Sequence, residues 1–286
     1  MKSESHPNFV FFGTDDFAVS VLEELKNQGW LPSLIVTNPD RPRGRYLKLE
    51  APPVKIWAED NNLPFLQPEK IDEVFGSELK NKVSDAQFFL VASFGKILPT
   101  NIINTPPGKT LNIHPSLLPE LRGPSPIEDT ILQGKKPAVT IIILDEEMDH
   151  GPILAEEEIN SFSLAAGKKE LEKTLATLGA RLIVKKVPDY LSGKLLPREQ
   201  EHSKATYTKK ITKEDGLIDL SDSPDKNYRK FLAYLPWPGI FFFLERGGKK
   251  IRVKITDASF ENGSFVIKKV IPEGKKEMDY KSFSRD

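Results

Sequence analysis

Three polar residues in the stretch from Leu111 to Gly151 have the chemistry of an acyl-transfer site. Asn112 and His114 lie two positions apart in an apolar run, so on a β-strand their side chains point to the same face. Asp149 follows a second apolar run, residues 139–144, and precedes a glycine in a predicted turn. If two strand ends meet here, an amide, an imidazole and a carboxylate converge on one site.

These groups suit the attack of an amine on a carbonyl carbon. An Asn amide or a protonated imidazole donates a hydrogen bond to the oxygen that becomes negative, and one such donor contributes about 3–4 kcal/mol. A carboxylate near the imidazole keeps it protonated and orders a water that removes the amine's proton. No Ser or Cys nucleophile is obviously paired with a base here, which favours direct transfer. The alternative interpretation is that His114 caps a strand end and Asp149 only forms an Asx-turn.

The same stretch resembles the signature of the 10-formyltetrahydrofolate-dependent formyltransferases. In order, the matching residues are Asn112-x-His114, Ser116–Pro119, Arg122-Gly123, Pro126 and Asp149-x-Gly151. The resemblance implies that Asn112, His114 and Asp149 are catalytic and that 10-formyltetrahydrofolate is the co-substrate. It also implies a set of donor-binding residues: Ser116, Leu117, Leu118, Pro119, Phe94, Gly95 and Ile97.

The chain departs from the family pattern at positions that leave the three polar groups in place. Ala138 stands where the family usually has Gly, and His150 fills a position that is usually Thr. Phe94 stands where Tyr is commoner, so a hydroxyl is missing from the predicted donor pocket.

A second stretch, residues 38–55, is basic and lacks periodicity. It has two prolines near its start and four cations between positions 41 and 48, namely Arg41, Arg43, Arg45 and Lys48. These features predict an exposed, mobile loop whose cations neutralise phosphates. A charged, solvated loop without a partner is the alternative. The sequence resembles the loop by which methionyl-tRNA formyltransferases grip the acceptor arm of their tRNA, which implies initiator methionyl-tRNA as the partner.

Composition sets the broad class. The chain has 286 residues, of which 38% are hydrophobic and 29% charged, and it has no cysteine. Disulfides and thiolate metal sites are therefore excluded, and the four scattered histidines predict no metal. No apolar run approaches the roughly 20 residues of a membrane span. These features predict a cytoplasmic globular protein without a membrane partner, and we expect a monomer.

Charge is distributed unevenly although the net charge is zero. Residues 1–180 contain 18 basic and 26 acidic residues, a net of −8, and residues 181–286 contain 23 and 15, a net of +8. A basic C-terminal part indicates a polyanionic partner, and a lysine-rich solvated surface is the alternative.

The elements predict an α/β fold with two domains. An apolar run at residues 9–13, a helical pattern up to Gly29 and a second apolar run at residues 34–37 indicate a β-α-β unit of a parallel, Rossmann-like sheet. A single Gly13 does not make a dinucleotide fingerprint, so NAD is not expected.

Near the C-terminus, short β-rich runs with glycine turns indicate a small OB-like barrel. The predicted boundaries are a catalytic domain at 1–192, a linker at 193–204 and a tRNA-binding domain at 205–286.

Four functions remain open at this point. A methionyl-tRNA formyltransferase accounts for both the polar trio and the basic loop. A sugar-nucleotide N-formyltransferase or a formyltetrahydrofolate hydrolase would keep the trio without needing the loop. A non-enzymatic RNA-binding protein would need only the basic features and would leave Asn112, His114 and Asp149 unexplained.

Overall fold

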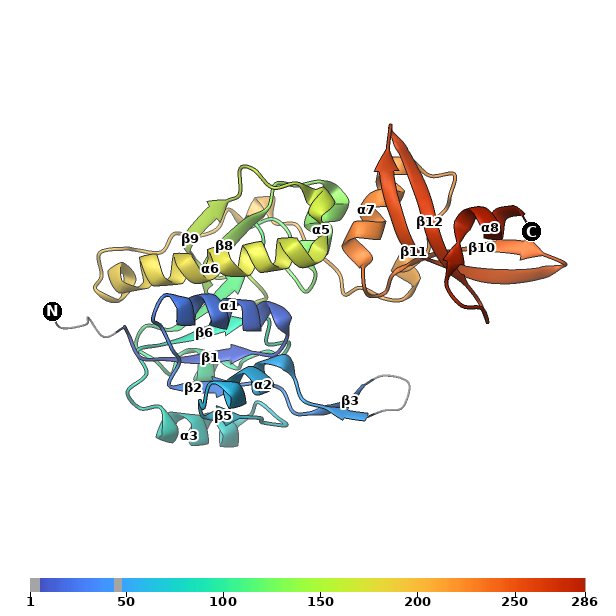
Figure 1. Cartoon of the computed structure of the whole chain (residues 1–286). Coiled ribbons are helices and arrows are strands. Elements are labelled where there is room, and N and C mark those ends of the chain that lie inside the picture. Colours follow the sequence, from blue (N-terminus) through green and yellow to red (C-terminus); the bar gives the residue numbers. More distant parts are fainter. Residues whose placement is uncertain (1–5, 44–47, 286) are drawn as a thin grey trace. The chain divides into compact units, whose positions relative to one another are not determined.

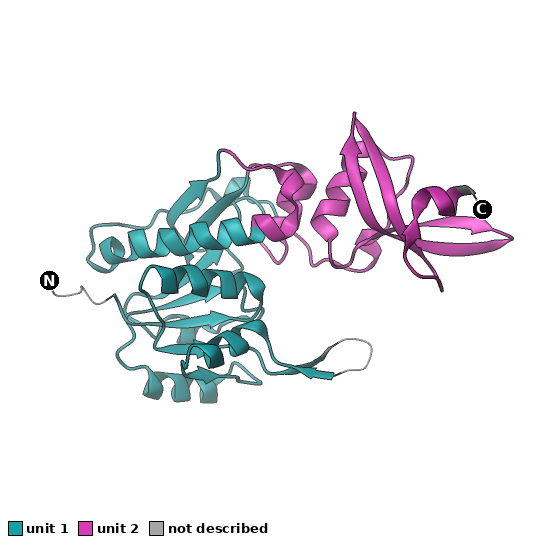
Figure 2. Ribbon diagram, viewed as in Figure 1, with its two compact units in different colours: residues 1–122, 137–160, 172–207 teal, residues 123–136, 161–171, 208–286 magenta. Residues whose placement is uncertain are grey.

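The computed structural model describes residues 6–43 and 48–285, and the chain divides into two compact units (Figure 2). Unit 1 contains residues 1–122, 137–160 and 172–207, and unit 2 contains residues 123–136, 161–171 and 208–286. The chain thus crosses between the units several times. The boundaries expected from the sequence, with a linker at 193–204, stay a prediction. In the division into compact units, residues 193–204 belong to unit 1.

Unit 1 is built on a seven-stranded sheet (Figure 1). In sheet order its strands are β5 (Phe65–Leu66), β2 (Leu34–Val36), β1 (Phe9–Gly13), β6 (Phe88–Ala92), β7 (Thr110–His114), β8 (Ala138–Ile143) and β9 (Ile153–Glu158). The first five strands are parallel, and β8 and β9 run antiparallel to their neighbours. The Rossmann-like parallel sheet predicted from the sequence is confirmed.

The central strands are buried on both faces because helices cover the sheet from both sides. Every residue of β1 and of β6 is buried, as their unbroken apolar runs predict. The helices of unit 1 are α1 (Asp16–Asn27), α2 (Pro53–Asp60), α3 (Glu73–Lys82), α4 (Thr100–Ile103) and most of α6 (Lys168–Leu191). Side chains of α3 and α4 join alternate residues of β1 and β6 in one core cluster, which places these two helices on the same face.

Helix α6 packs on the opposite face, very close to β7. A Cβ atom added to Gly179 of α6 would lie 2.5 Å from Ile113 Cγ2 and 3.4 Å from Val139 Cγ1. Successive strand residues alternate between faces, so Ile113 faces α6 while its neighbours Asn112 and His114 face the α3/α4 side. The absence of a side chain at Gly179 thereby sets how closely the helix approaches the strand that carries two of the candidate catalytic residues.

Unit 2 combines helices with a four-stranded antiparallel sheet. Its helices are α5 (Pro126–Gln133), α7 (Pro224–Tyr234) and α8 (Tyr280–Arg285), and its strands, in sheet order, are β10 (Ile240–Arg246), β11 (Lys249–Glu261), β12 (Ser264–Pro272) and β13 (Met278–Asp279). One face of β10 and β11 carries buried Ile240, Phe242, Val253 and Ile255, which form its apolar core. The small C-terminal β-rich domain predicted from the sequence is confirmed, and its strands form an antiparallel sheet.

The basic stretch differs in part from the irregular loop predicted for it. Strands β3 (Arg41–Arg43) and β4 (Lys48–Glu50) form an antiparallel ribbon, in which Arg41 pairs with Glu50 and Arg43 with Lys48 (Figure 1). The ribbon has only two strands and the described side chains of β4 are exposed, so no alternation of apolar and polar residues marks it in the sequence. Exposure was predicted correctly, and the strand pairing was not.

Across the described ranges 6–43 and 48–285, none of the helices is long and apolar enough to cross a membrane.

We expect Gly179→Val to lower the free energy of unfolding of unit 1 by about 1–3 kcal/mol, because the added atoms overpack the contact with Ile113. Lys185→Val on the exposed side of the same helix is the matched control and should change stability by less than about 0.5 kcal/mol. Urea unfolding followed by tryptophan fluorescence measures both, since Trp30 and Trp57 lie in unit 1. Equal stabilities of the two variants would contradict the close packing.

Candidate active site

Strand β7 positions the first two groups of the site. Asn112 pairs with Val91 on one side and Ile142 on the other, and His114 is the last residue of the strand, opposite Thr140. Both side chains point to the same face, as their spacing requires. His114 is almost completely buried and Asn112 is half-buried.

Asp149 is brought to the site by a loop that turns back, and not by the end of a strand as the sequence suggested. Strand β8 is antiparallel to β7, so its last residue lies opposite Leu111, away from His114. The loop of residues 144–152 therefore turns back to carry Asp149 toward the site. A Cβ atom at Gly151 would lie 1.8 Å from the carbonyl oxygen of Ile143, so this close return requires glycine. Asp149 itself adopts a left-handed backbone conformation, with φ of 53°.

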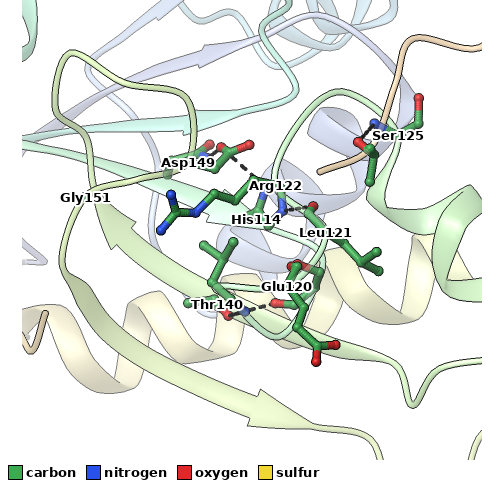
Figure 3. A network of polar contacts seen from close by, with 12 residues as sticks. His114, Glu120, Leu121, Arg122, Ser125, Thr140, Asp149 and Gly151 are labelled. Carbon is green, nitrogen blue, oxygen red and sulfur yellow. Dashed lines mark hydrogen bonds and ion pairs between the residues drawn. The ribbon is translucent and has the colours of Figure 1, made fainter. Parts of the chain in front are cut away.

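The three groups meet at a single carboxylate oxygen. Asp149 Oδ1 lies 3.5 Å from His114 Nδ1 and 3.5 Å from Asn112 Nδ2. On its other side, His114 Nε2 lies 3.0 Å from the carbonyl oxygen of Leu121 (Figure 3). The structure thus brings together all three residues that the sequence nominated as catalytic.

The two ring nitrogens of His114 face different acceptors. A carbonyl oxygen only accepts hydrogen bonds, so Nε2 carries a hydrogen toward Leu121. Nδ1 faces the Asp149 carboxylate at 3.5 Å, which is an ion-pair distance and longer than an ordinary hydrogen bond.

The loop that follows β7 is fixed by its own hydrogen bonds. The Ser116 hydroxyl donates to the carbonyl of Glu120 (2.7 Å), and the Thr140 hydroxyl donates to the carbonyl of Ser116 (2.7 Å) and accepts from the amide of Leu118 (3.1 Å). Leu121 is buried with a positive φ of 60°. These contacts hold the Leu121 carbonyl where His114 needs its acceptor.

Of the predicted donor-binding residues in this loop, Ser116 and Leu118 are buried. The Leu118 side chain packs with Ile142 and Ile153, while Leu117 and Pro119 are half-buried. Ser116 and Leu118 therefore shape the loop from within, and donor binding by the four residues stays a prediction.

The second predicted donor-binding segment, Phe94 to Pro99, follows β6. The Phe94 ring is buried against Phe12, and its carbonyl accepts hydrogen bonds from the side chains of Thr14 and Asn38 (2.9 and 2.8 Å). Ile97 projects outward and is 80% exposed.

Next to this segment, Thr100 donates a 3.0 Å hydrogen bond to Glu146, which joins the start of α4 to the loop of Asp149. The two loops that border the candidate site are thereby connected.

Two cations of the basic ribbon, Arg41 and Lys48, belong to the described residues. The Arg41 guanidinium forms a 2.7 Å ion pair with Glu69, both side chains being more than half exposed. Lys48 is exposed. Arg45 and the side chain of Arg43 lie outside the described residues, so the predicted cation cluster is placed only in part.

Sequence reasoning missed a buried network beside Asp149. Arg122 is 2% exposed, and its Nη2 donates to Gln200 Oε1 (2.7 Å) and to His202 Nδ1 (2.9 Å). Gln200 in turn donates to the backbone carbonyls of Asp149 (2.9 Å) and Gly151 (2.7 Å). The sequence signalled Arg122 through its motif, whereas Gln200 lies in the polar stretch interpreted as a linker.

His150, one of the departures from the family pattern, also belongs to this region. Its Nδ1 lies 2.7 Å from Asp145 Oδ2, and its ring stacks on His202 with centroids 4.1 Å apart. The side chain is held by these two partners, one of which belongs to the same loop as Asp149. Among the residues that the structure describes, no group of three His, Asp or Glu side chains is arranged to hold a metal ion.

Comparisons with known proteins agree with this geometry. The model of the family described as formyl transferase matches residues 7–187, and that of its C-terminal domain matches residues 210–264. The methionyl-tRNA formyltransferase of Chloroflexus aurantiacus is 42% identical over 245 residues, which cover 85% of this chain and 78% of the relative. The chain belongs to the methionyl-tRNA formyltransferase family of formyl-transferring enzymes.

Solved structures show the same fold. A methionyl-tRNA formyltransferase from Clostridium thermocellum has a TM-score of 0.60 at 17% identity, over 96% of this chain and 99% of that chain. HypX from Aquifex aeolicus, in complex with tetrahydrofolic acid, has a TM-score of 0.66 at 16% identity, over 98% of this chain and 47% of that chain. Sugar N-formyltransferases of known structure are similar as well. The fold therefore does not by itself distinguish the formyl acceptor.

Proposed function

We propose that the protein transfers the formyl group of 10-formyltetrahydrofolate to the α-amino group of methionyl-initiator tRNA, for translation initiation. The observation that carries the proposal is the convergence of Asn112, His114 and Asp149 on one carboxylate oxygen, in a chain whose relatives are methionyl-tRNA formyltransferases. We expect it to act as a monomer in the cytoplasm, where charged initiator tRNA is used.

The donor supplies a formyl carbon, to which the amine nitrogen of the acceptor bonds as the carbon–nitrogen bond of the donor breaks; the amine loses one proton and the leaving nitrogen of the donor takes one up, which releases tetrahydrofolate. The Asn112 amide has two hydrogens, and only one is directed at Asp149, so the other is available to the formyl oxygen. A donor at this position stabilises the negative charge that develops there, by about 3–4 kcal/mol.

His114 contributes through one particular nitrogen. Its Nε2 is committed to Leu121 at 3.0 Å, whereas the 3.5 Å contact of Nδ1 with Asp149 is longer than a hydrogen bond of ordinary strength. Nδ1 is therefore the ring nitrogen able to donate to the formyl oxygen. Asp149 keeps the imidazolium charged and takes up, through an ordered water, the proton that the attacking amine loses.

The residues around the site suit a folate as the formyl donor. 10-Formyltetrahydrofolate has a partly reduced pterin with polar edges and an aromatic aminobenzoyl ring, and such ligands bind where apolar side chains lie beside a few polar groups. Ile97 and Met148, 80% and 57% exposed, present apolar surface on the two loops joined by the Thr100–Glu146 hydrogen bond. HypX, which shares the fold, binds tetrahydrofolic acid.

Features of both units suit a tRNA acceptor. In unit 1 the ribbon carries Arg41 and Lys48, with Arg43 and Arg45 completing the predicted cluster. In unit 2 one face of β10 and β11 brings cations against aromatic rings: Lys250 Nζ lies 4.6 Å from the ring centroid of exposed Phe243, and Arg252 Cζ lies 3.8 Å from that of buried Phe241. Cations that follow the phosphates and an exposed ring for stacking are typical of nucleic-acid-binding surfaces.

The alternative functions differ in the product that each would form. We would supply 10-formyltetrahydrofolate with methionyl-tRNA, with an amino-sugar nucleotide, or with no acceptor. Formyl-methionyl-tRNA as the only product is the expected result. Product with the sugar alone would identify a sugar-nucleotide N-formyltransferase, and formate without an acceptor would identify a hydrolase. Salt-sensitive RNA binding without any turnover would indicate an RNA-binding protein.

Replacement of the catalytic side chains should abolish most turnover without unfolding the chain. We expect His114→Ala to lower kcat by about 10²–10³-fold because the formyl oxygen loses a donor. Asp149→Asn should lower it by about 10²–10⁴-fold because proton removal fails. Glu147→Gln, an exposed carboxylate of the same loop, is the matched control and should keep normal turnover. Near-normal rates in either test variant, with thermal melting unchanged, would refute its assigned role.

Loss of a ribbon cation should affect the tRNA and spare the folate. Arg45→Ala is expected to raise KM for methionyl-tRNA severalfold, to reduce the slope of log KM against log salt by about one unit, and to leave KM for 10-formyltetrahydrofolate unchanged. Lys185→Ala removes a cation from the exposed side of α6 and should change neither constant. Equal effects of Arg45→Ala on both substrates would argue against phosphate binding by the ribbon.

A further inference from the structure

The side chain of Gln200 connects the loop of Asp149 to a buried cation. Gln200 is 4% exposed although it lies in a polar stretch of the sequence. Both hydrogens of its amide nitrogen are used, one on the carbonyl of Asp149 at 2.9 Å and one on the carbonyl of Gly151 at 2.7 Å. One side chain therefore holds the backbone on both sides of His150.

Arg122 fixes the orientation of this amide. Its Nη2 lies 2.7 Å from Gln200 Oε1, and a guanidinium only donates hydrogen bonds. The oxygen of Gln200 must therefore face Arg122 and the nitrogen must face the loop. A hydrogen bond from a charged donor is stronger than one between neutral groups, so the amide is held firmly.

Arg122 is itself anchored in the interior of unit 1. Its backbone amide donates to the carbonyl of Thr206 at 2.9 Å, and its Nη2 and Nη1 also approach His202 Nδ1 (2.9 Å) and the Tyr207 hydroxyl (3.4 Å). The preceding residue, Leu121, provides the carbonyl that accepts from His114 Nε2. The anchor of Gln200 is thus covalently adjacent to the acceptor of the catalytic imidazole.

The backbone held by Gln200 is one that would otherwise relax. Asp149 has φ of 53°, a left-handed conformation that costs free energy for any residue with a side chain and persists only where the surroundings enforce it. The carboxylate contacts that the site depends on are 3.5 Å long, so a small displacement of the backbone would break them.

We propose that Gln200 is a positioning residue for Asp149: its amide, oriented by Arg122, holds the loop in the conformation that delivers the carboxylate to His114 and Asn112. The proposal rests on the proposed catalytic role of Asp149. The competing explanation is that Gln200 only fastens residues 198–207 to unit 1 and contributes to stability.

Two substitutions distinguish the hydrogen bonds that Gln200 donates to the loop from the one that it accepts from Arg122. Gln200→Met keeps the length and apolar stem of the side chain and removes every hydrogen bond. Gln200→Glu keeps an oxygen for Arg122 but faces the carbonyls of Asp149 and Gly151 with an acceptor in place of two donors. If the loop contacts matter for catalysis, both variants lower kcat by about 10–100-fold, as a misplaced catalytic group does, with both KM values nearly unchanged. Full activity of Gln200→Glu would overturn the proposal.

A double-mutant cycle with Asp149→Asn tests whether Gln200 acts through Asp149. If it does, Gln200→Met has little further effect on single-turnover rates once the carboxylate is gone, because there is no charge left to position. A merely structural role predicts that the same factor is lost in both backgrounds, which would overturn the proposal. Near-normal turnover of Asp149→Asn would instead remove the proposed catalytic role, and the positioning role with it.

Thr130→Val is the control for lost stability. Thr130 is a buried residue of α5 in unit 2, and its hydroxyl donates a 2.8 Å hydrogen bond to the carbonyl of Pro126. The isosteric change deletes a buried hydrogen bond without touching the candidate site, so kcat should stay normal while thermal stability falls. A loss of kcat in Thr130→Val equal to that in Gln200→Met would show that general destabilisation explains both, and would overturn the proposal.

Discussion

The site depends on the placement of two acceptors around a buried imidazole. His114 Nε2 lies 3.0 Å from a carbonyl oxygen, and its Nδ1 lies 3.5 Å from a carboxylate oxygen. Both oxygens belong to residues in loops, outside helices and strands. Leu121 and Asp149 both have left-handed backbones, at φ of 60° and 53°, so two irregular loops converge on one side chain at the end of a strand. The free energy stored in these conformations is released if either loop moves, and the hydrogen bonds around them oppose that movement.

The sheet explains why the loops are needed. A purely parallel sheet gathers functional groups at the carboxyl ends of its strands, where all the loops begin on one edge. Here β8 reverses direction beside β7, so its end lies opposite Leu111 and its loop must return along the strand. Gly151 makes this return possible by passing within contact distance of Ile143, and the antiparallel pair leaves Thr140 opposite His114 to bind the loop after β7. The reversal of β8 thus supplies both a route for Asp149 and a support for the acceptor of His114.

Much of this architecture was predictable from local sequence patterns, whereas the parts that depend on long-range contacts were not. The unbroken apolar runs of β1 and β6 indicated buried parallel strands, and the spacing of Asn112 and His114 indicated a shared face. The antiparallel direction of β8 has no signature in its own residues, so the expected convergence of two strand ends was wrong, although the three side chains do lie close together. Gln200 was not predicted because its partners, Asp149 and Arg122, are 51 and 78 positions away, and its polar neighbours resemble a linker. The ribbon β3–β4 was missed because an exposed two-stranded ribbon has no buried face to impose a pattern.

The distribution of charge in the chain is consistent with a division of tasks in a single enzyme. The part of the chain that contains the candidate catalytic residue Asp149, residues 1–180, has a net charge of −8. We expect the cations that bind a polyanionic acceptor to lie on the ribbon, a local basic segment within that acidic part, and on one face of β10 and β11, within a C-terminal part of net charge +8. Because such cations act on phosphates over roughly a Debye length, we expect them to increase the encounter rate with tRNA without having to enter the candidate active site. We therefore expect the choice of acceptor to be made by surfaces around the formyl-transfer site, since solved structures with this fold include both a methionyl-tRNA formyltransferase and sugar N-formyltransferases.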